Sequence, residues 1–216
     1  MKLVFARRSI LASCLAGSLG LLASAQALPD LIIARYLAKT TIEYKRRAFS
    51  ADECPYVEGC VLATGARKLL LLDVGIKNVG LSDLVIGDPA ASPNLFEWSD
   101  CHEHYHLKGL ATYRVLTLSG RQVARTYKQG FCLRDDYAVM PRADDAKYTC
   151  DDQGISVGWL DHYYKSLDCQ WVDITGVPPG KYNLVITVNP YRVLKESNYQ
   201  NNTTVIPITV PRNVYY

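Results

Sequence analysis

Short β-rich segments recur along this chain with turn sequences between them, and helical periodicity is almost absent. A helical turn or two is expected only within residues 34–47. Tyr182, Leu184, Ile186 and Val188 alternate with smaller or more polar residues, so this segment has one apolar face. The expected strands cover residues 68–77, 81–86, 111–118, 122–127, 172–174, 182–189 and 203–210. The pattern predicts a mainly β fold, a single antiparallel β-sandwich domain with long irregular loops.

The length of 216 residues suits one domain and a targeting segment. Residues 1–27 have a basic start, an uncharged apolar stretch and small residues ending in Ala25-Gln26-Ala27, as in an export signal. We expect cleavage before Leu28, which leaves a domain over residues 28–216 in the periplasm or outside the cell. A buried first helix, a twin-arginine signal at Arg7-Arg8 and a lipid-modified Cys14 remain alternatives.

The charge of the expected domain argues against binding to nucleic acid. The leader holds three of the 24 basic residues and no acidic one, so 21 basic and 21 acidic residues remain. A chain without net positive charge lacks the usual electrostatic basis for binding a polyanion. No later segment has the roughly 18 consecutive apolar residues that a membrane-spanning helix needs.

Six cysteines remain after the leader. An even number in an exported chain predicts three disulfides, and six cysteines allow 15 pairings. Residues 134–157 are polar and rich in turn residues, and we interpret them as a loop held by two of these cysteines, Cys132 and Cys150. The other four are Cys54, Cys60, Cys101 and Cys169.

Three of the four histidines alternate in one hexapeptide, Cys101-His102-Glu103-His104-Tyr105-His106. In an extended segment, side chains two residues apart point to the same face, which would bring the three imidazoles together. The hexapeptide therefore predicts a metal site. Three imidazole ligands in an exported protein suit copper or zinc, and the ligand chemistry does not decide between them.

Several motifs occur in an order and spacing that resemble the catalytic domain of the lysyl oxidase family. The resemblance begins near Pro29 and covers nearly all of the expected domain. The motifs are Glu97-Trp98-Ser99-Asp100 before the histidines, Lys128-Gln129-Gly130-Phe131-Cys132-Leu133, Gln153-Gly154-Ile155-Ser156, Asp168-Cys169-Gln170-Trp171, Val188-Asn189-Pro190 and Glu196-Ser197-Asn198.

This resemblance implies a copper-dependent amine oxidase with its copper ligands at His102, His104 and His106. It also implies a lysine tyrosylquinone made from the protein itself, with Lys128 and Tyr163 at the family's lysine and tyrosine positions. Such an enzyme oxidises primary amines with O2 to aldehydes and releases H2O2 and ammonia.

The sequence leaves the substrate open between peptidyl-lysine and small amines. Asp161 and His162 flank Tyr163 and are candidates for the base that removes a proton from the substrate. The resemblance also suggests a disulfide pattern. The implied pairings are Cys54 with Cys101, Cys60 with Cys169 and Cys132 with Cys150, with a local bond between Cys54 and Cys60 as a competitor.

Two other functions fit part of the pattern. A β-sandwich that binds copper without catalysis needs only the histidines. A zinc hydrolase would need a carboxylate base beside them, and within the motif only Glu103 is available, on the opposite face of an extended strand.

Overall fold

The computed structural model describes residues 27–128, 131–141 and 143–214. The expected export signal falls almost wholly outside these ranges. Two short helices and one 3-10 turn accompany the strands; they are α1 (Arg35–Thr40), α2 (Cys54–Val57) and η1 (Pro89–Ala91). The strands are β1 (Leu31–Ile33), β2 (Glu43–Phe49), β3 (Gly65–Leu71), β4 (Val74–Asn78), β5 (Leu84–Gly87), β6 (Phe96–Ser99), β7 (His104–Leu107), β8 (Ala111–Leu116), β9 (Gln122–Arg125), β10 (Tyr137–Ala138), β11 (Gln153–Ile155), β12 (Trp159–Tyr163), β13 (Trp171–Asp173), β14 (Gly180–Val188) and β15 (Thr203–Val210).

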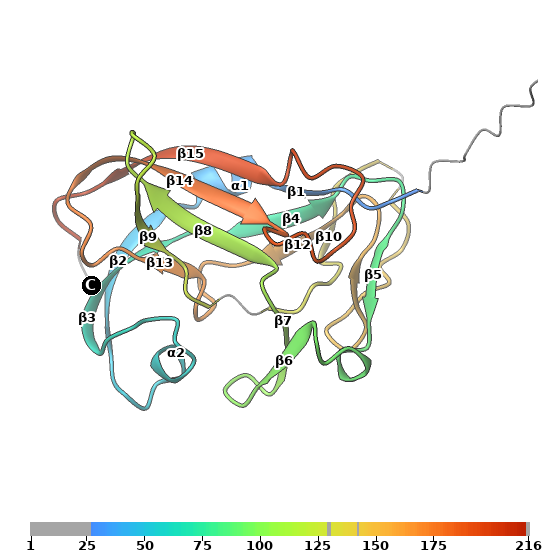
Figure 1. Ribbon diagram of the computed structural model, residues 1–216, viewed down its shortest axis with the longest axis horizontal. Helices are drawn as coiled ribbons and strands as arrows, with labels where there is room; N and C mark the ends of the chain where they lie inside the picture. Colours follow the sequence, from blue (N-terminus) through green and yellow to red (C-terminus); the bar gives the residue numbers. More distant parts are fainter. Residues whose placement is uncertain (1–26, 129–130, 142, 215–216) are drawn as a thin grey trace, which may run out of the picture.

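The strands form several antiparallel sheets that share one apolar core. One sheet has the strand order β15-β14-β8-β9, and the others include β1-β4-β12-β10 and β13-β3-β2. In Figure 1 the first of these sheets runs along the top of the molecule, with β4, β12 and β13 behind and beneath it. Buried residues from both layers, such as Ile76 on β4 and Leu184 on β14, belong to one hydrophobic cluster. The predicted mainly β, antiparallel fold class is confirmed.

The segment expected as one strand over residues 68–77 is two strands in different sheets. β3 pairs with β2 and β13, whereas β4 pairs with β1 and β12. The change of sheet falls at Leu72 and Asp73. The backbone N–H of Asp73 donates to Thr41 Oγ1, and its carboxylate accepts from the backbone N–H of Lys165. These two hydrogen bonds replace the ladder, so the segment forms a corner between two sheets at Asp73, where its apolar run is interrupted.

Three disulfides join distant parts of the fold. They connect Cys54 to Cys101, Cys60 to Cys169, and Cys132 to Cys150. These are the pairings that the resemblance implied, and the local bond between Cys54 and Cys60 does not form. The first disulfide ties the start of α2 to the segment that carries the histidines.

The β6–β7 hairpin and α2 lie together on one side of the molecule, beneath the sheets in Figure 1. β6 pairs antiparallel with β7, with Glu97 opposite His106 and Ser99 opposite His104. On another sheet, β12 pairs with β4 through Tyr163 and Val74. Within the described ranges, no helix has both the length and the apolar character needed to span a membrane.

Candidate functional site

The three histidines of the hexapeptide converge. His106 Nε2 lies 3.2 Å from His102 Nδ1 and 3.2 Å from His104 Nε2. One ring nitrogen from each histidine lies within 4.8 Å of the others. Nitrogens at this spacing can share one ion at the metal–nitrogen distance of about 2.0–2.1 Å that is typical of zinc–imidazole bonds.

The convergence does not arise from strict alternation, as the sequence suggested. Only His104 and His106 lie on β7, while His102 lies in the turn before it. The backbone N–H groups of His102 and Glu103 both donate to the Ser99 carbonyl, and Glu103 has a φ of 55°. This tight turn brings the His102 ring back toward the strand. Glu103 is exposed.

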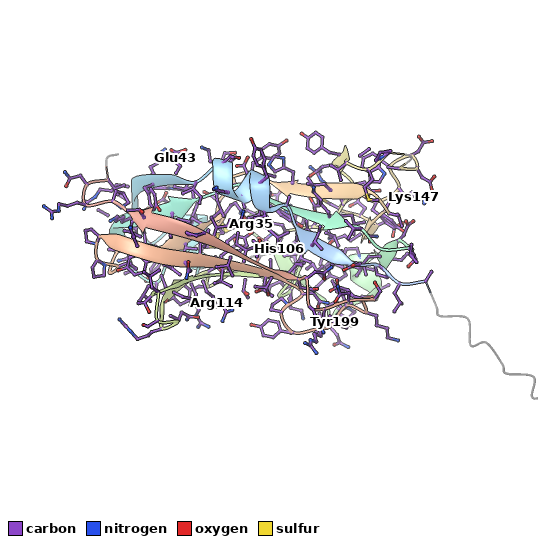
Figure 2. All side chains as sticks on the ribbon, turned by 90° about the horizontal axis from the view of Figure 1, so that it is seen from above. Arg35, Glu43, His106, Arg114, Lys147 and Tyr199 are labelled. Atoms are coloured by element: carbon purple, nitrogen blue, oxygen red, sulfur yellow. A yellow bond between two sulfur atoms is a disulfide. The ribbon has the colours of Figure 1, made fainter. Side chains whose placement is uncertain are left out.

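His106 is the buried member of the cluster, with 1% of its surface exposed. In Figure 2 its label lies near the middle of the molecule, away from the outline. Burial, together with the neighbouring His104, lowers the pKa of His106 to about 4. A neutral imidazole is the form that binds a metal ion.

A charged network lies beside His102. The Glu58 carboxylate, which follows α2, accepts a hydrogen bond from Ser99 Oγ and lies 3.8 Å from His102 Nε2. Lys128 Nζ is 3.3 Å from carboxylate oxygens of both Glu58 and Glu97. Burial alone would raise the pKa of Glu58, but the Ser99 hydrogen bond and the Lys128 charge outweigh it and lower the pKa.

Tyr163 lies in a different pocket. Its side chain is 4% exposed, and its hydroxyl donates to Asp161 Oδ2 at 2.5 Å, with the Cys132 carbonyl 3.2 Å away. A cavity of about 320 Å³ is lined by Tyr163, Asp161, His162 and His104 among others. Burial raises the pKa of the Tyr163 hydroxyl and that of the Asp161 carboxyl well above their usual values, and their proximity raises that of Tyr163 further.

The two base candidates from the sequence have different surroundings. Asp161 contacts the Tyr163 hydroxyl directly, since residues two apart on β12 share a face. His162 Nε2 is 3.1 Å from Asp73 Oδ2, and its ring stacks on Tyr164 at 3.9 Å. His162 therefore borders the cavity but is held by groups outside it.

The structure does not bring Lys128 and Tyr163 together. Lys128 pairs with Glu58 and Glu97, and no hydrogen bond or ion pair links it to Tyr163 in the described part of the chain. The Phe131 ring bridges the space between the histidines and the tyrosine: its centroid is 5.0 Å from that of Tyr163 and 6.4 Å from that of His106.

Sequence reasoning missed the roles of four residues of this site. Glu58 lies between two cysteines far from the histidines in sequence, and only the disulfide from Cys54 to Cys101 could have indicated its position. Glu97 and Phe131 stand inside motifs that were recognised, but no role was assigned to them. Ser99 was noted only as part of a motif, and here it holds Glu58.

The fold and the histidine cluster together define a disulfide-linked β-sandwich protein in which three imidazoles could hold one metal ion. The family model for lysyl oxidase matches residues 32–214. Lysyl oxidase homolog 2 of Xenopus laevis is 38% identical over 187 residues, and lysyl oxidase homolog 4 of Homo sapiens is 35% identical over 186 residues. Each alignment covers 81% of this chain. The chain belongs to the lysyl oxidase family.

The match does not extend over the whole of those relatives. The aligned region is 24% of the length of each of the two proteins, so the chain spans about a quarter of the curated relatives it matches. Activities and partners that depend on the remaining three quarters do not carry over with the family assignment.

Proposed function

We propose that this protein is a copper-dependent amine oxidase that converts primary amines, including peptidyl-lysine, to aldehydes. The observation that carries the proposal is the convergence of His102, His104 and His106 beside the cavity that holds Tyr163, in a chain of the lysyl oxidase family. The reaction consumes an amine, O2 and water, and yields an aldehyde, ammonia and H2O2.

The histidine cluster fits a copper ion. Its three ring nitrogens approach one another closely, and the low pKa of His106 keeps that ring neutral at neutral pH. Copper stands at the top of the divalent affinity series for such nitrogen sites. When bound here, copper would supply redox chemistry with O2 next to the tyrosine cavity.

The two precursors of the quinone are present but apart, so the cofactor is the part of the proposal that needs a rearrangement. In the proposed sequence, the Tyr163 ring is oxidised by one O2 to an ortho-quinone with release of water. The Lys128 amine then adds to the ring, and a second O2 accepts two electrons and two protons as H2O2. To reach the ring, Lys128 has to leave Glu58 and Glu97.

Among the two base candidates, the contacts favour Asp161. Its carboxylate already accepts a hydrogen bond from the Tyr163 hydroxyl, whereas the His162 ring is oriented by Asp73 and Tyr164. Burial raises the pKa of Asp161, and a carboxylate with a raised pKa removes protons more effectively near neutral pH. We assign His162 a positioning role at the rim of the cavity.

The expected export also remains a proposal, with a mature domain over residues 28–216. Three disulfides suit an oxidising compartment such as the periplasm or the outside of the cell. Measuring the mass of the N-terminus of protein recovered from an exporting host would test cleavage before Leu28.

The test of the function is to express the chain with copper in air and to measure amine-dependent H2O2 release. Phenylhydrazine, which reacts with carbonyl groups, should abolish the activity. After reduction and digestion, mass spectrometry should find one species containing both Lys128 and Tyr163. Fully copper-loaded protein that has only separate, unmodified peptides and no H2O2 release would instead be a copper-binding module without oxidase activity.

A further inference from the structure

A groove of about 790 Å³ lies on the outer face of the β15-β14-β8-β9 sheet. Residues alternate along β8, so Tyr113 and Val115 point into the core while Thr112 and Arg114 face the groove. Glu58, Glu97 and Lys128 line another part of the same groove. The groove therefore reaches the charged network beside the histidines.

Two arginines in this groove oppose each other without an acidic partner. Arg114 on β8 pairs directly with Arg125 on β9 in the antiparallel ladder, so both side chains lie on the same face. In the described part of the chain neither forms an ion pair with a carboxylate, and Arg125 Cζ lies 5.3 Å from the centroid of the Tyr127 ring. Like charges directly opposite each other destabilise a sheet, so an anion bound between them would relieve an existing repulsion.

The rest of the groove does not neutralise these arginines. Its charged lining consists of four cations, Lys108, Arg114, Arg125 and Lys128, and two carboxylates, Glu58 and Glu97. Both carboxylates are engaged by Lys128. Positive charge is thus in excess toward the arginines, and negative charge is concentrated near the histidines. Figure 2 shows Arg114 at the side of the molecule opposite Glu43.

We propose that this groove binds an acidic peptide substrate, with a carboxylate between Arg114 and Arg125 and the lysine directed toward Glu58 and Glu97. The inference rests on the proposed oxidase function and adds to it a substrate class, lysine with a nearby acidic side chain or chain-terminal carboxylate. Planar guanidinium groups suit bidentate binding of carboxylates. If Lys128 leaves the groove to join the cofactor, Glu58 and Glu97 become available for a substrate ammonium group.

The test measures binding to the full copper-loaded protein without O2, which limits oxidation to one peptide molecule for each quinone. Three labelled lysine peptides are compared by fluorescence anisotropy: one with two glutamates, one with glutamines in their place and an amidated end, and one with glutamines and a free terminal carboxylate. The glutamate peptide should bind about tenfold more tightly than the amidated glutamine peptide, as charge-assisted contacts allow. Raising the salt concentration to about 1 M should remove most of this preference. The third peptide shows whether a terminal carboxylate suffices.

The variants Arg114→Gln and Arg125→Gln should each reduce the preference, and together they should abolish it. Arg46→Gln changes an exposed arginine on β2 that does not line the groove, so it is the matched control and should keep the preference. Equal affinity of the wild-type protein for the glutamate and amidated glutamine peptides would overturn the inference, and this comparison does not depend on any variant folding. A sulfated oligosaccharide that binds through the arginines while the acidic peptide does not would also overturn it.

Oxidation assays separate this inference from the function on which it rests. If amines are oxidised with the same kcat/KM whether or not they carry a carboxylate, the oxidase stands and the groove assignment fails. If the acidic peptide binds through Arg114 and Arg125 but no amine is oxidised, the groove binds peptides and the proposed function fails. If the oxidase function and the groove assignment both hold, the arginine variants should oxidise the acidic peptide less efficiently relative to a diamine. The ratio of their kcat/KM values measures this.

Discussion

The two residues proposed to form the cofactor lie in contrasting surroundings. Lys128 is in a wide polar groove, paired with Glu58 and Glu97, and Glu97 keeps 43% of its side chain exposed. Tyr163 is almost fully buried in a smaller cavity, and its hydroxyl is hydrogen-bonded to a carboxyl group that is itself buried. The histidines lie beside both the groove and the tyrosine cavity, since His102 approaches Glu58 and His104 lines the cavity.

This contrast shows that each reactive group is satisfied separately. The lysine is neutralised by nearby carboxylates, and the tyrosine hydroxyl has a buried acceptor, so neither needs the other for the fold to be stable. Joining them costs the contacts that each one now makes. In the proposed function, copper at the histidines would supply the oxidative chemistry that makes the covalent link favourable.

The largest expected effect is the loss of amine oxidation when Tyr163 is replaced. Replacing Tyr163 with Phe removes the hydroxyl from which the ring oxidation starts, so amine oxidation should fall to the background rate and the linked species should disappear. Copper content should stay near that of the wild type, because no ligand changes. Tyr164→Phe is the matched control: its hydroxyl bonds Tyr137 rather than Asp161, and it should keep the activity. Activity in the Tyr163 variant would exclude this tyrosine as the cofactor precursor.

Removing a histidine should affect metal and activity together. His104→Ala takes away one of the three converging nitrogens and should weaken copper binding by more than the roughly 10–100-fold loss typical of changes in outer-shell partners. His162→Asn, which changes the only other histidine, should leave the copper content unchanged. Metal analysis after dialysis measures both. Full copper occupancy in the His104 variant would place the metal elsewhere.

The sequence predicted the histidine cluster because the three residues are close together in the chain. Their grouping within one hexapeptide indicated a ligand set without any knowledge of the fold. The geometry was less predictable, since the turn at Glu103 with its positive φ brings His102 into place rather than simple strand alternation. Turns of this kind depend on hydrogen bonds, here to the Ser99 carbonyl, that the residue pattern does not specify.

The remainder of the site was harder to foresee because it depends on contacts between distant segments. Glu58 reaches Lys128 across 70 residues, and it is near the histidines because of the disulfide from Cys54 to Cys101. Similarly, β3 and β4 were expected as one strand, since an apolar run does not reveal that Asp73 forms a corner between sheets. Alternating strands such as β14 were predicted well, because burial of one face leaves a clear local pattern.

A smaller effect is expected from the buried carboxyl next to the tyrosine. Burial raises the pKa of Asp161 in the folded state, so its contribution to stability is fully present below the unfolded pKa of about 3.9 and is lost as the pH rises through the folded pKa. Asp161→Asn, which keeps an acceptor for Tyr163, should therefore raise the melting temperature of the copper-free protein at pH 8. A change of about 1 kcal/mol corresponds to about 2–4 °C in a domain of this size.

The same variant distinguishes a catalytic role from a structural one. The stability gain of Asp161→Asn should shrink as the pH is lowered toward 4, while its kcat should be reduced at every pH if Asp161 is the base. Thermal denaturation across pH and steady-state kinetics measure the two effects independently. If the Asp161→Asn variant were less stable than the wild type at pH 8, burial of the ionised Asp161 carboxylate would not be destabilising, which contradicts this interpretation.

The smallest effect should come from removing one of the two ion pairs that Lys128 forms. Lys128 is proposed to leave its two carboxylates before it reaches Tyr163, so Glu97→Gln should speed formation of the linked species. A partly exposed ion pair contributes about 0.2–1 kcal/mol, which corresponds to a rate increase of about 1.4-fold to fivefold if the pair is lost before the slow step. The measurement follows the linked peptide by mass spectrometry after copper is added in air. Glu103→Gln, an exposed glutamate in the histidine turn, is the control and should not change the rate. A slower reaction in the Glu97 variant would mean that this carboxylate guides Lys128 toward the ring rather than holding it back. The groove with Lys128 and the cavity with Tyr163 would then both contribute to forming the link.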